Sequence, residues 1–431
     1  MVSFDVRRTM KTMTGVLVLL ALGLPSTTFS QRGAQRQIAE NLQDEIRAAE
    51  LRAGPNSAEL IEPLTTLGQL YENGGEPLFA AVAFRRAVEV VRVNYGLHSL
   101  EQAPLTRRLI ENAEAAGDHE LAWDLEQDLL TLAERHPDDL RTARILRETA
   151  DRRMDILARY NAGEFPPEIV LGCYYGDGSC NAGSSHSVKQ RLVFEAQTYY
   201  AQAVRIILGN QRYSSDELPQ LLMELAVISY RYGNPSLGRR SLSYLLAYQT
   251  KNSRDWVTRI DALVQIADWD LLHAVGRDAE DAALAEYAQA YELLERNGTA
   301  QESIDQMFSP ETPVVLPAFL PNPLATKEKH ESLGHIDVAF DVDRHGRSRH
   351  VRVLDTSANS TRLAEKRLVQ LISRGRFRPR FEHGRVVDAA PMAVRYSFND
   401  VRTTDSDDWS LYWAPTEALR WPHAVGVARG P

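Results

Sequence analysis

Two cysteines are the residues with the most distinctive chemistry in this 431-residue chain. Cys173 and Cys180 flank the segment YYGDGS, whose Gly and Asp residues favour a turn. Such a pair can form a disulfide, act as a redox switch or contribute to a metal site. Two thiols without a neighbouring His cluster fall short of the ligands that a structural metal needs, so we predict a Cys173–Cys180 disulfide and no metal. Closing so short a loop would stabilise the fold by about 2 to 3 kcal/mol.

Catalytic signatures are missing from the rest of the sequence. It contains no G-x-S-x-G, no H-E-x-x-H and no Gly-rich phosphate loop. The eleven histidines are scattered, and His345 and His383 fall in predicted turns, where a surface position is more common than a catalytic one. We therefore expect a binding protein and not an enzyme, with no cofactor.

The amino terminus has the layout of a secretion signal. Basic residues precede an apolar run from Gly15 to Leu24, which a proline and small polar residues close. As a helix, this run would cover roughly 15 Å, about half of a hydrocarbon core near 30 Å. We predict that residues 1–30 are a signal peptide and that the chain is periplasmic. Retention of this segment as an inner-membrane anchor is the alternative.

Most of the chain has the pattern of paired helices. Apolar residues recur every four positions, as in Ile38, Leu42 and Ile46, and the segment ENGGEPLFAAVAF is echoed by EAAGDHELAWDL 42 residues later. The residues that match the spacing of a tetratricopeptide (TPR) repeat are Leu64, Leu67, Gly68, Tyr71, Ala80, Phe84 and Ala87. We predict an α-solenoid of TPR-like hairpins over residues 31–162 and 191–308, a type of array that usually binds a protein.

Two segments are predicted to interrupt this organisation. Residues 163–190 contain both cysteines and two consecutive prolines, and we expect a loop insertion there. Residues 309–332 contain five prolines, which disfavour helices and sheet interiors, so we expect a semi-extended linker.

Beyond this linker the hydrophobic period changes from 3.6 to 2, over residues 333–398. Ile336, Val338, Phe340 and Val342 alternate with other residues, which is typical of a half-buried strand. A turn, a second strand, an amphipathic helix and the alternating segments RFRPRF and PMAVRYSF follow. The whole chain is therefore predicted to be an α+β multidomain protein, a helical array followed by a small α+β domain.

Residues 333–398 resemble the C-terminal domain of TonB, the energy transducer family. The residues that occupy the places of its pattern are Gly334, Asp343, Gly346, Val351, Val353, Phe377 and Pro379. In that family the closing strand pairs with an extended peptide of an outer-membrane receptor, an example of strand addition. The resemblance therefore implies a peptide-binding edge formed by Ala393, Val394, Arg395, Tyr396, Ser397 and Phe398. The aromatic tail, residues 399–431, could fold back over this edge.

Charge is unevenly distributed along the chain. Residues 344–395 hold 12 Arg and one Lys against four acids, whereas the whole chain has a net charge of −9. This surplus indicates either a solvated face or a basic surface for an acidic partner, such as a receptor segment or an anionic membrane surface. Nucleic acid is not an expected partner of an exported chain.

Three functions fit these features. The first is a periplasmic adaptor, whose repeats hold one protein while the sheet domain captures a peptide of an envelope protein or outer-membrane receptor. The second is an anchored TonB-type energy transducer, and the third is a structural protein that binds the cell wall or a membrane surface. A mature amino terminus at Gln31 would exclude the anchored transducer.

Overall fold

The computed structural model forms two compact units, Met1–Leu192 and Val193–Pro431. It describes residues 27–161, 163–174, 185–210, 217–252, 256–308, 313–318, 334–389, 391–398 and 413–419. Among these residues, no helix has the length and hydropathy needed to cross a membrane. The helix α1 begins at Thr27, within the segment predicted as a signal peptide.

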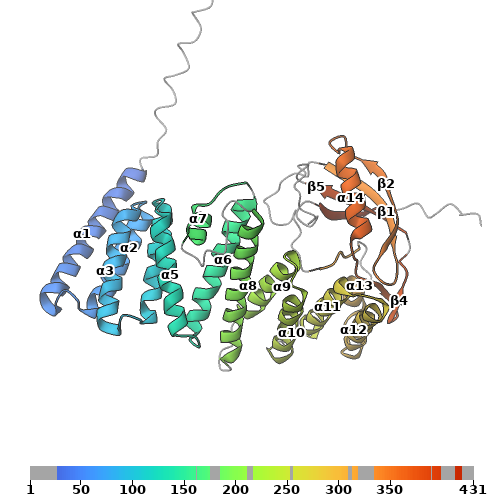
Figure 1. Cartoon of the computed structure of the whole chain (residues 1–431), viewed down its shortest axis with the longest axis horizontal. Helices are drawn as coiled ribbons and strands as arrows, with labels where there is room; N and C mark the ends of the chain where they lie inside the picture. Colours follow the sequence, from blue (N-terminus) through green and yellow to red (C-terminus); the bar gives the residue numbers. More distant parts are fainter. Residues whose placement is uncertain are drawn as a thin grey trace, which may run out of the picture. The chain divides into compact units, whose positions relative to one another are not determined.

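The first unit is a row of helices, drawn in blue and green in Figure 1. Its elements are α1 (Thr27–Ala53), η1 (Ala58–Leu60), α2 (Ile61–Asn73), α3 (Pro77–Tyr95), η2 (Leu100–Gln102), α4 (Ala103–Ala115), α5 (His119–Arg135), α6 (Leu140–Asn161), α7 (Pro167–Tyr174) and the first part of α8 (Ser185–Gly209). Each helix from α1 to α5 packs against the next one along the chain. These helical hairpins confirm the predicted repeat architecture.

A shared turn explains the repeated glycines. Gly75, Gly117 and Gly233 follow a helix and have φ angles of 73°, 76° and 73°. The residue after each glycine donates its backbone N–H to a carbonyl five positions earlier, in the bonds Glu76 to Tyr71, Asp118 to Ala113 and Asn234 to Ser229. This is the Schellman ending of a helix, in which glycine adopts the left-handed conformation without a Cβ clash.

Small residues allow the paired helices to approach closely. A Cβ atom on Gly68 of α2 would lie 2.5 Å from the Phe84 ring of α3, and one on Gly238 would lie 2.2 Å from Trp269. Phe84, Trp269 and Tyr287 are buried, whereas Tyr71 is partly buried. The glycines therefore occupy places that a larger side chain would disrupt.

The interruption around the cysteines differs from the loop that was expected. Residues 167–174 form α7, which packs against α5, and Ile169 is fully buried. Pro167 is the first residue of this helix, where a missing N–H costs nothing and the fixed φ is favourable. The side chain of Cys173 and all of Cys180 lie outside the described residues, so the disulfide stays a prediction.

The second unit joins the remaining helices to the sheet domain. Its helices are the rest of α8, α9 (Leu218–Arg231), α10 (Pro235–Asn252), α11 (Trp256–His273), α12 (Arg277–Arg296), α13 (Gln301–Phe308) and α14 (Arg362–Arg374). Its strands are β1 (Gly334–Val342), β2 (Ser348–Thr356), β3 (Arg380–Glu382), β4 (Arg385–Val387), β5 (Met392–Phe398) and β6 (Trp413–Leu419). We call the part from β1 to β6 the sheet domain.

The sheet domain contains an antiparallel sheet in the order β2-β1-β5-β6 and a separate β3–β4 hairpin. Alternate residues of β1 and β5, including Ile336, Val338 and Val394, pack with Leu368 and Ile372 of α14 in one core. The helix α14 also packs along β2 (Figure 1). The predicted strand β1 is therefore confirmed, but it is buried on both faces from Ile336 to Phe340 instead of being half-buried.

Part of the predicted linker is a structural element. Val315 forms a β-bridge with Phe377, and Leu316 donates its N–H to the Arg376 carbonyl at 2.9 Å. Leu316 is also buried in the core that α11, α12 and α13 form. These residues lie between Pro313 and Pro317 and keep their own N–H donors, which explains how they can pair. Of the predicted linker, only residues 313–318 lie within the described part of the chain.

Candidate protein-interaction surfaces

The predicted peptide-binding edge is the strand β5, and its outer side is already paired. On one side β5 pairs with β1 from Gly334↔Phe398 to Phe340↔Met392. On the other side β6 pairs with it antiparallel, from Ala393↔Leu419 to Phe398↔Trp413. The alternation in PMAVRYSF predicts β5 as a strand and leaves open whether the tail covers it. In the structure β5 is an inner strand, and β6 occupies its outer side.

The side chains of β5 have structural roles. Val394 and Tyr396 are fully buried in the sheet core, and burial raises the pKa of the Tyr396 hydroxyl. Ala393 and Ser397 are buried as well. Arg395 donates to both carboxylate oxygens of Asp337 on β1, at 2.8 and 2.9 Å. An added strand would therefore be recognised chiefly by the β5 backbone, as strand addition requires. The side chain of Phe398 lies outside the described part.

The opposite end of the sheet, β2, is protected against strand addition. Its register with β1 shifts between Ala339 and Asp341, and His350 has a φ of 53° at this irregularity. Charged residues, among them Arg349 and Arg352, are exposed along the strand. A bulge and exposed charges both disfavour pairing with another chain. The β5 side is therefore the better candidate for a partner strand.

A buried ion pair joins the sheet domain to the helical array. Arg378 donates to the two carboxylate oxygens of Asp268 on α11 at 2.9 and 2.6 Å. The Arg378 side chain is 9% exposed and that of Asp268 is 0% exposed. Tyr287 of α12 donates to the same carboxylate at 2.6 Å, and burial together with the nearby Asp268 charge raises the pKa of its hydroxyl.

An aromatic cluster completes this junction. Phe381 of β3 is buried against Tyr291 of α12 and Phe308 of α13, with ring centroids 6.3 and 5.5 Å away. Tyr287 lies 6.0 Å from the same ring. The sequence predicts a sheet domain beyond a spacer. In the structure, this domain packs directly on the helices that end the array.

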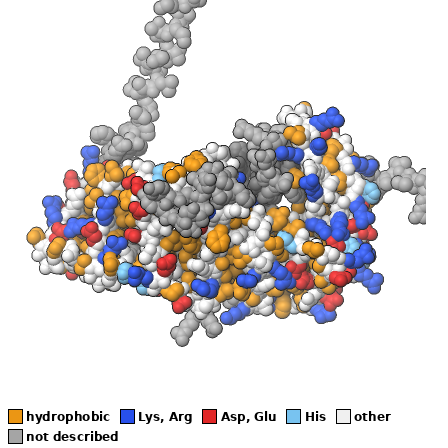
Figure 2. Space-filling model, in the orientation of Figure 1, with side chains coloured by type: hydrophobic (Ala, Val, Ile, Leu, Met, Phe, Trp, Pro, Cys, Tyr) orange, Lys and Arg blue, Asp and Glu red, His pale blue; other side chains and the backbone are white. Residues whose placement is uncertain are grey.

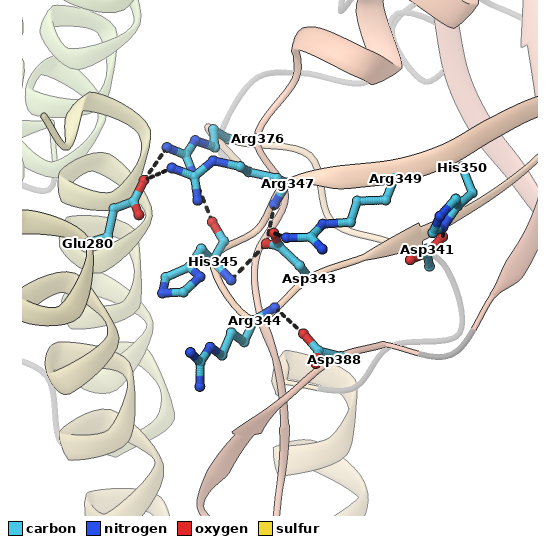
Figure 3. A network of polar contacts seen from close by, with 10 residues as sticks. All are labelled: Glu280, Asp341, Asp343, Arg344, His345, Arg347, Arg349, His350, Arg376 and Asp388. Atoms are coloured by element: carbon cyan, nitrogen blue, oxygen red, sulfur yellow. Dashed lines mark hydrogen bonds and ion pairs between the residues drawn. The ribbon is translucent and has the colours of Figure 1, made fainter. Parts of the chain in front are cut away.

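A second group of polar contacts surrounds the β1–β2 turn (Figure 3). Glu280 of α12 accepts hydrogen bonds from Arg347 and Arg376. Asp343 accepts from the backbone N–H groups of His345 and Arg347 at 2.9 and 3.0 Å, and from Arg349 at 2.7 Å. Burial opposes ionisation of these two acids, but the arginines and N–H donors outweigh it and lower the pKa of each. A polar cavity of about 440 Å³ lies beside this network.

These contacts change the interpretation of the basic segment. Arg347, Arg349, Arg376, Arg378 and Arg395 all pair with acids of the chain itself. Figure 2 shows Lys and Arg side chains interspersed with Asp and Glu side chains on the visible face. Much of the positive surplus therefore serves to hold the fold together, which leaves less of it for an acidic partner.

Exposed apolar side chains gather on one face of α3. Leu78, Phe79 and Val82 are 71%, 61% and 64% exposed. Phe79 also contacts the Tyr71 ring of α2, with centroids 5.5 Å apart. Single exposed apolar residues are common, but a contiguous group on a solvated helix is typical of a protein-binding surface.

The tertiary structure also brings together two carboxyl groups that sequence spacing did not reveal. Asp270 of α11 pairs with Arg239 at 2.7 Å, and Glu286 of α12 lies 3.7 Å from the same guanidinium. Burial and the neighbouring Asp270 charge raise the pKa of Glu286 to about 7. A raised pKa means that the folded state favours the protonated carboxyl, relative to its ordinary value of 4.5.

This pKa predicts that stability falls as pH rises. The folded state binds the Glu286 proton more tightly than the unfolded state, so its contribution is complete below pH 4.5 and is lost as pH rises through about 7. We expect a loss of about 1 to 2 kcal/mol, because this partly exposed group is screened by solvent. Urea unfolding between pH 4.5 and 8 should show this fall in the native chain and a flatter profile for Glu286→Gln. Glu292→Gln, at an exposed pair, should leave the native profile unchanged; an unaltered Glu286→Gln profile contradicts the assignment.

One cluster of possible metal ligands is already engaged by an arginine side chain. His335, Asp337 and Asp355 offer ligand atoms that all lie within 4.8 Å of one another. Both carboxylate oxygens of Asp337 already accept from Arg395, however. We assign no metal role to this group.

Comparisons with known proteins give a weak structural likeness. No family model and no curated protein matches the chain. Among solved structures, the nearly identical TPR-like repeats of a kinesin light chain from Podosopora anserina are 14% identical, over 57% of this chain and 99% of that one, with a TM-score of 0.33. BtubC (BKLC) from P. vanneervenii is 14% identical, over 61% and 92%, with a TM-score of 0.35. At such low scores these likenesses carry no argument. The repeat architecture is shown by the helix pairs and their shared turn.

Proposed function

We propose that this chain is a protein–protein interaction adaptor of the bacterial cell envelope. In this proposal the helical repeats hold one protein, and the TonB-like sheet domain binds an extended peptide of an envelope protein or outer-membrane receptor. The role is one of binding, without a catalytic step. The signal-like amino terminus supports a periplasmic location.

The observation that carries the proposal is the pairing of β5. Its outer side accepts an antiparallel strand from Ala393 to Phe398, so its backbone groups are arranged for strand addition. The described side chains from Ala393 to Ser397 are buried or held by Asp337. The exposed apolar face of α3 supports a separate protein-binding role for the helical array.

A peptide library tests this function. Random eight-residue peptides, displayed on phage, would be selected against the full chain. We expect enriched peptides to have alternating apolar residues, and a free peptide with the β6 sequence, WAPTEAL, to compete with them. A library that yields no binders, or binders that this peptide does not displace, would contradict capture at β5.

A proline substitution within β5 is a poor test of this edge. Replacing Arg395 by Pro removes a possible ladder donor, but it also removes the ion pair with Asp337 that joins β5 to β1. The loss of binding in such a variant would therefore report unfolding as much as a blocked edge. Substitutions in β6 avoid this ambiguity because they leave the β1–β5 pair intact.

A further inference from the structure

The ladder between β5 and β6 is less regular than the one between β5 and β1. From Gly334 to Phe340, β1 pairs with β5 without a shift in register. By contrast, Arg395 pairs with Glu417 and Tyr396 pairs with Pro415, so Thr416 is an extra residue in β6. The outer ladder is therefore interrupted by a bulge, whereas the inner ladder is continuous.

The strand β6 is the edge of the sheet, so it can separate from β5 without breaking the pairs that join β2, β1 and β5. Within the described residues, the extensive backbone contact of β6 is with β5. The described core of the sheet domain contains residues of β1, β5 and α14.

We propose that β6 is a built-in competitor for the outer side of β5, and that an extended peptide with an acidic residue opposite Arg395 displaces it. This inference rests on the proposed capture of a peptide by the sheet domain. The competing strand keeps the β5 backbone paired until the partner is present, which protects an edge that would otherwise pair with other chains.

The register indicates the chemistry of the partner. Asp337, Arg395 and Glu417 lie side by side in register across β1, β5 and β6. A strand that replaces β6 would place its own residue opposite Arg395, and opposite charges on neighbouring strands favour pairing. A peptide without the extra residue would pair continuously with β5. The preferred partner is therefore an extended segment that forms no bulge and has an acidic residue opposite Arg395.

A defined peptide and an opened variant test this competition. The probe is the labelled peptide WATTEAL, which is the β6 sequence with Thr in place of Pro415. In the full chain, the double substitution Glu417→Pro/Ala418→Pro removes two adjacent N–H donors. Neighbouring residues of a strand point their N–H groups in opposite directions, so one of these two donors must face β5. The control, Glu417→Gln/Ala418→Ser, keeps both donors.

A tethered strand acts at an effective concentration on the order of millimolar, so the native chain should bind the probe weakly. We expect the opened variant to bind WATTEAL at least about tenfold more tightly than the native chain and the control do. The same peptide with Lys in place of Glu should bind the opened variant several-fold more weakly. Fluorescence anisotropy measures each affinity, and urea unfolding checks that the variants remain folded.

The outcomes separate the two proposals. Equal, measurable affinity of the native chain and the opened variant overturns the competitor and leaves peptide capture standing. No binding by either chain overturns both.

Hydrogen exchange of the native chain gives a second measurement that needs no variant. We expect the β6 amides to exchange much faster than those of β1, and equally slow exchange would identify β6 as a fixed strand.

Discussion

Replacing Arg378 by Met should lower the free energy of unfolding by about 3 to 5 kcal/mol. The substitution keeps most of the side-chain volume but removes the two hydrogen bonds to Asp268, which has no exposed surface. The remaining carboxylate would be buried without its cation, and an unpaired buried charge is far more costly than the pair itself is stabilising. Urea unfolding followed by circular dichroism measures the change.

A matched control uses an exposed arginine of the same segment. Arg380 pairs with Glu382, but the two side chains are 40% and 53% exposed, so Arg380→Met should cost less than about 1 kcal/mol. The double variant Asp268→Leu/Arg378→Met should recover much of the stability that the single variant loses, because no charge is left buried. If Arg378→Met costs no more than Arg380→Met, the ion pair does not hold the junction.

Replacing Gly346 by Ala should destabilise the sheet domain by about 2 to 4 kcal/mol. Gly346 has a φ of 76°, and a Cβ atom there would lie 2.2 Å from the carbonyl oxygen of Phe377. The obstacle is backbone, which cannot rotate away, and Phe377 also donates its N–H to the Gly346 carbonyl at 2.9 Å. The added methyl would therefore disturb both the β1–β2 turn and the segment beside it.

Gly384 provides the control for conformation alone. It has a φ of 73° in the β3–β4 turn, but the nearest atom to its Cβ position lies 3.6 Å away, in the Tyr291 ring. Gly384→Ala should therefore cost about 1 kcal/mol, the conformational penalty without the clash. Thermal and urea unfolding of both variants would show this difference. Equal losses would mean that the approach to Phe377 is unimportant.

The junction has a consequence for how the second unit binds partners. Phe381 and Leu316 fill the apolar surface that α12 and α13 would otherwise expose at the end of the array. Helical repeats need such a cover at their ends, because each repeat buries one face against its neighbour. The sheet domain therefore acts as the cap of the final helices, and a strand bound at β5 would belong to the same compact unit as these helices.

Local patterns predicted much of this fold. The period of 3.6 up to residue 308 and the period of 2 after residue 333 identified the helices and strands, since each depends on which neighbours along one element share a face. The repeated glycines predicted the turns for a similar reason, because a left-handed φ such as that of Gly75 is a property of one residue. The segment 393–398 was likewise identified as a strand from its own alternation.

Contacts between distant residues escaped prediction. The basic composition after residue 344 indicated a charged surface, yet Arg378 and Asp268 are 110 positions apart and nothing local links them. The sequence raised the coverage of β5 by the tail without deciding it, because Pro415 and the extra Thr416 obscure the strand pattern of β6. Alternation, repeats and turn glycines are local in the chain, so they specify the type of each element. Which arginine is neutralised, and which strand edge is covered, depends on the folding of remote segments against one another.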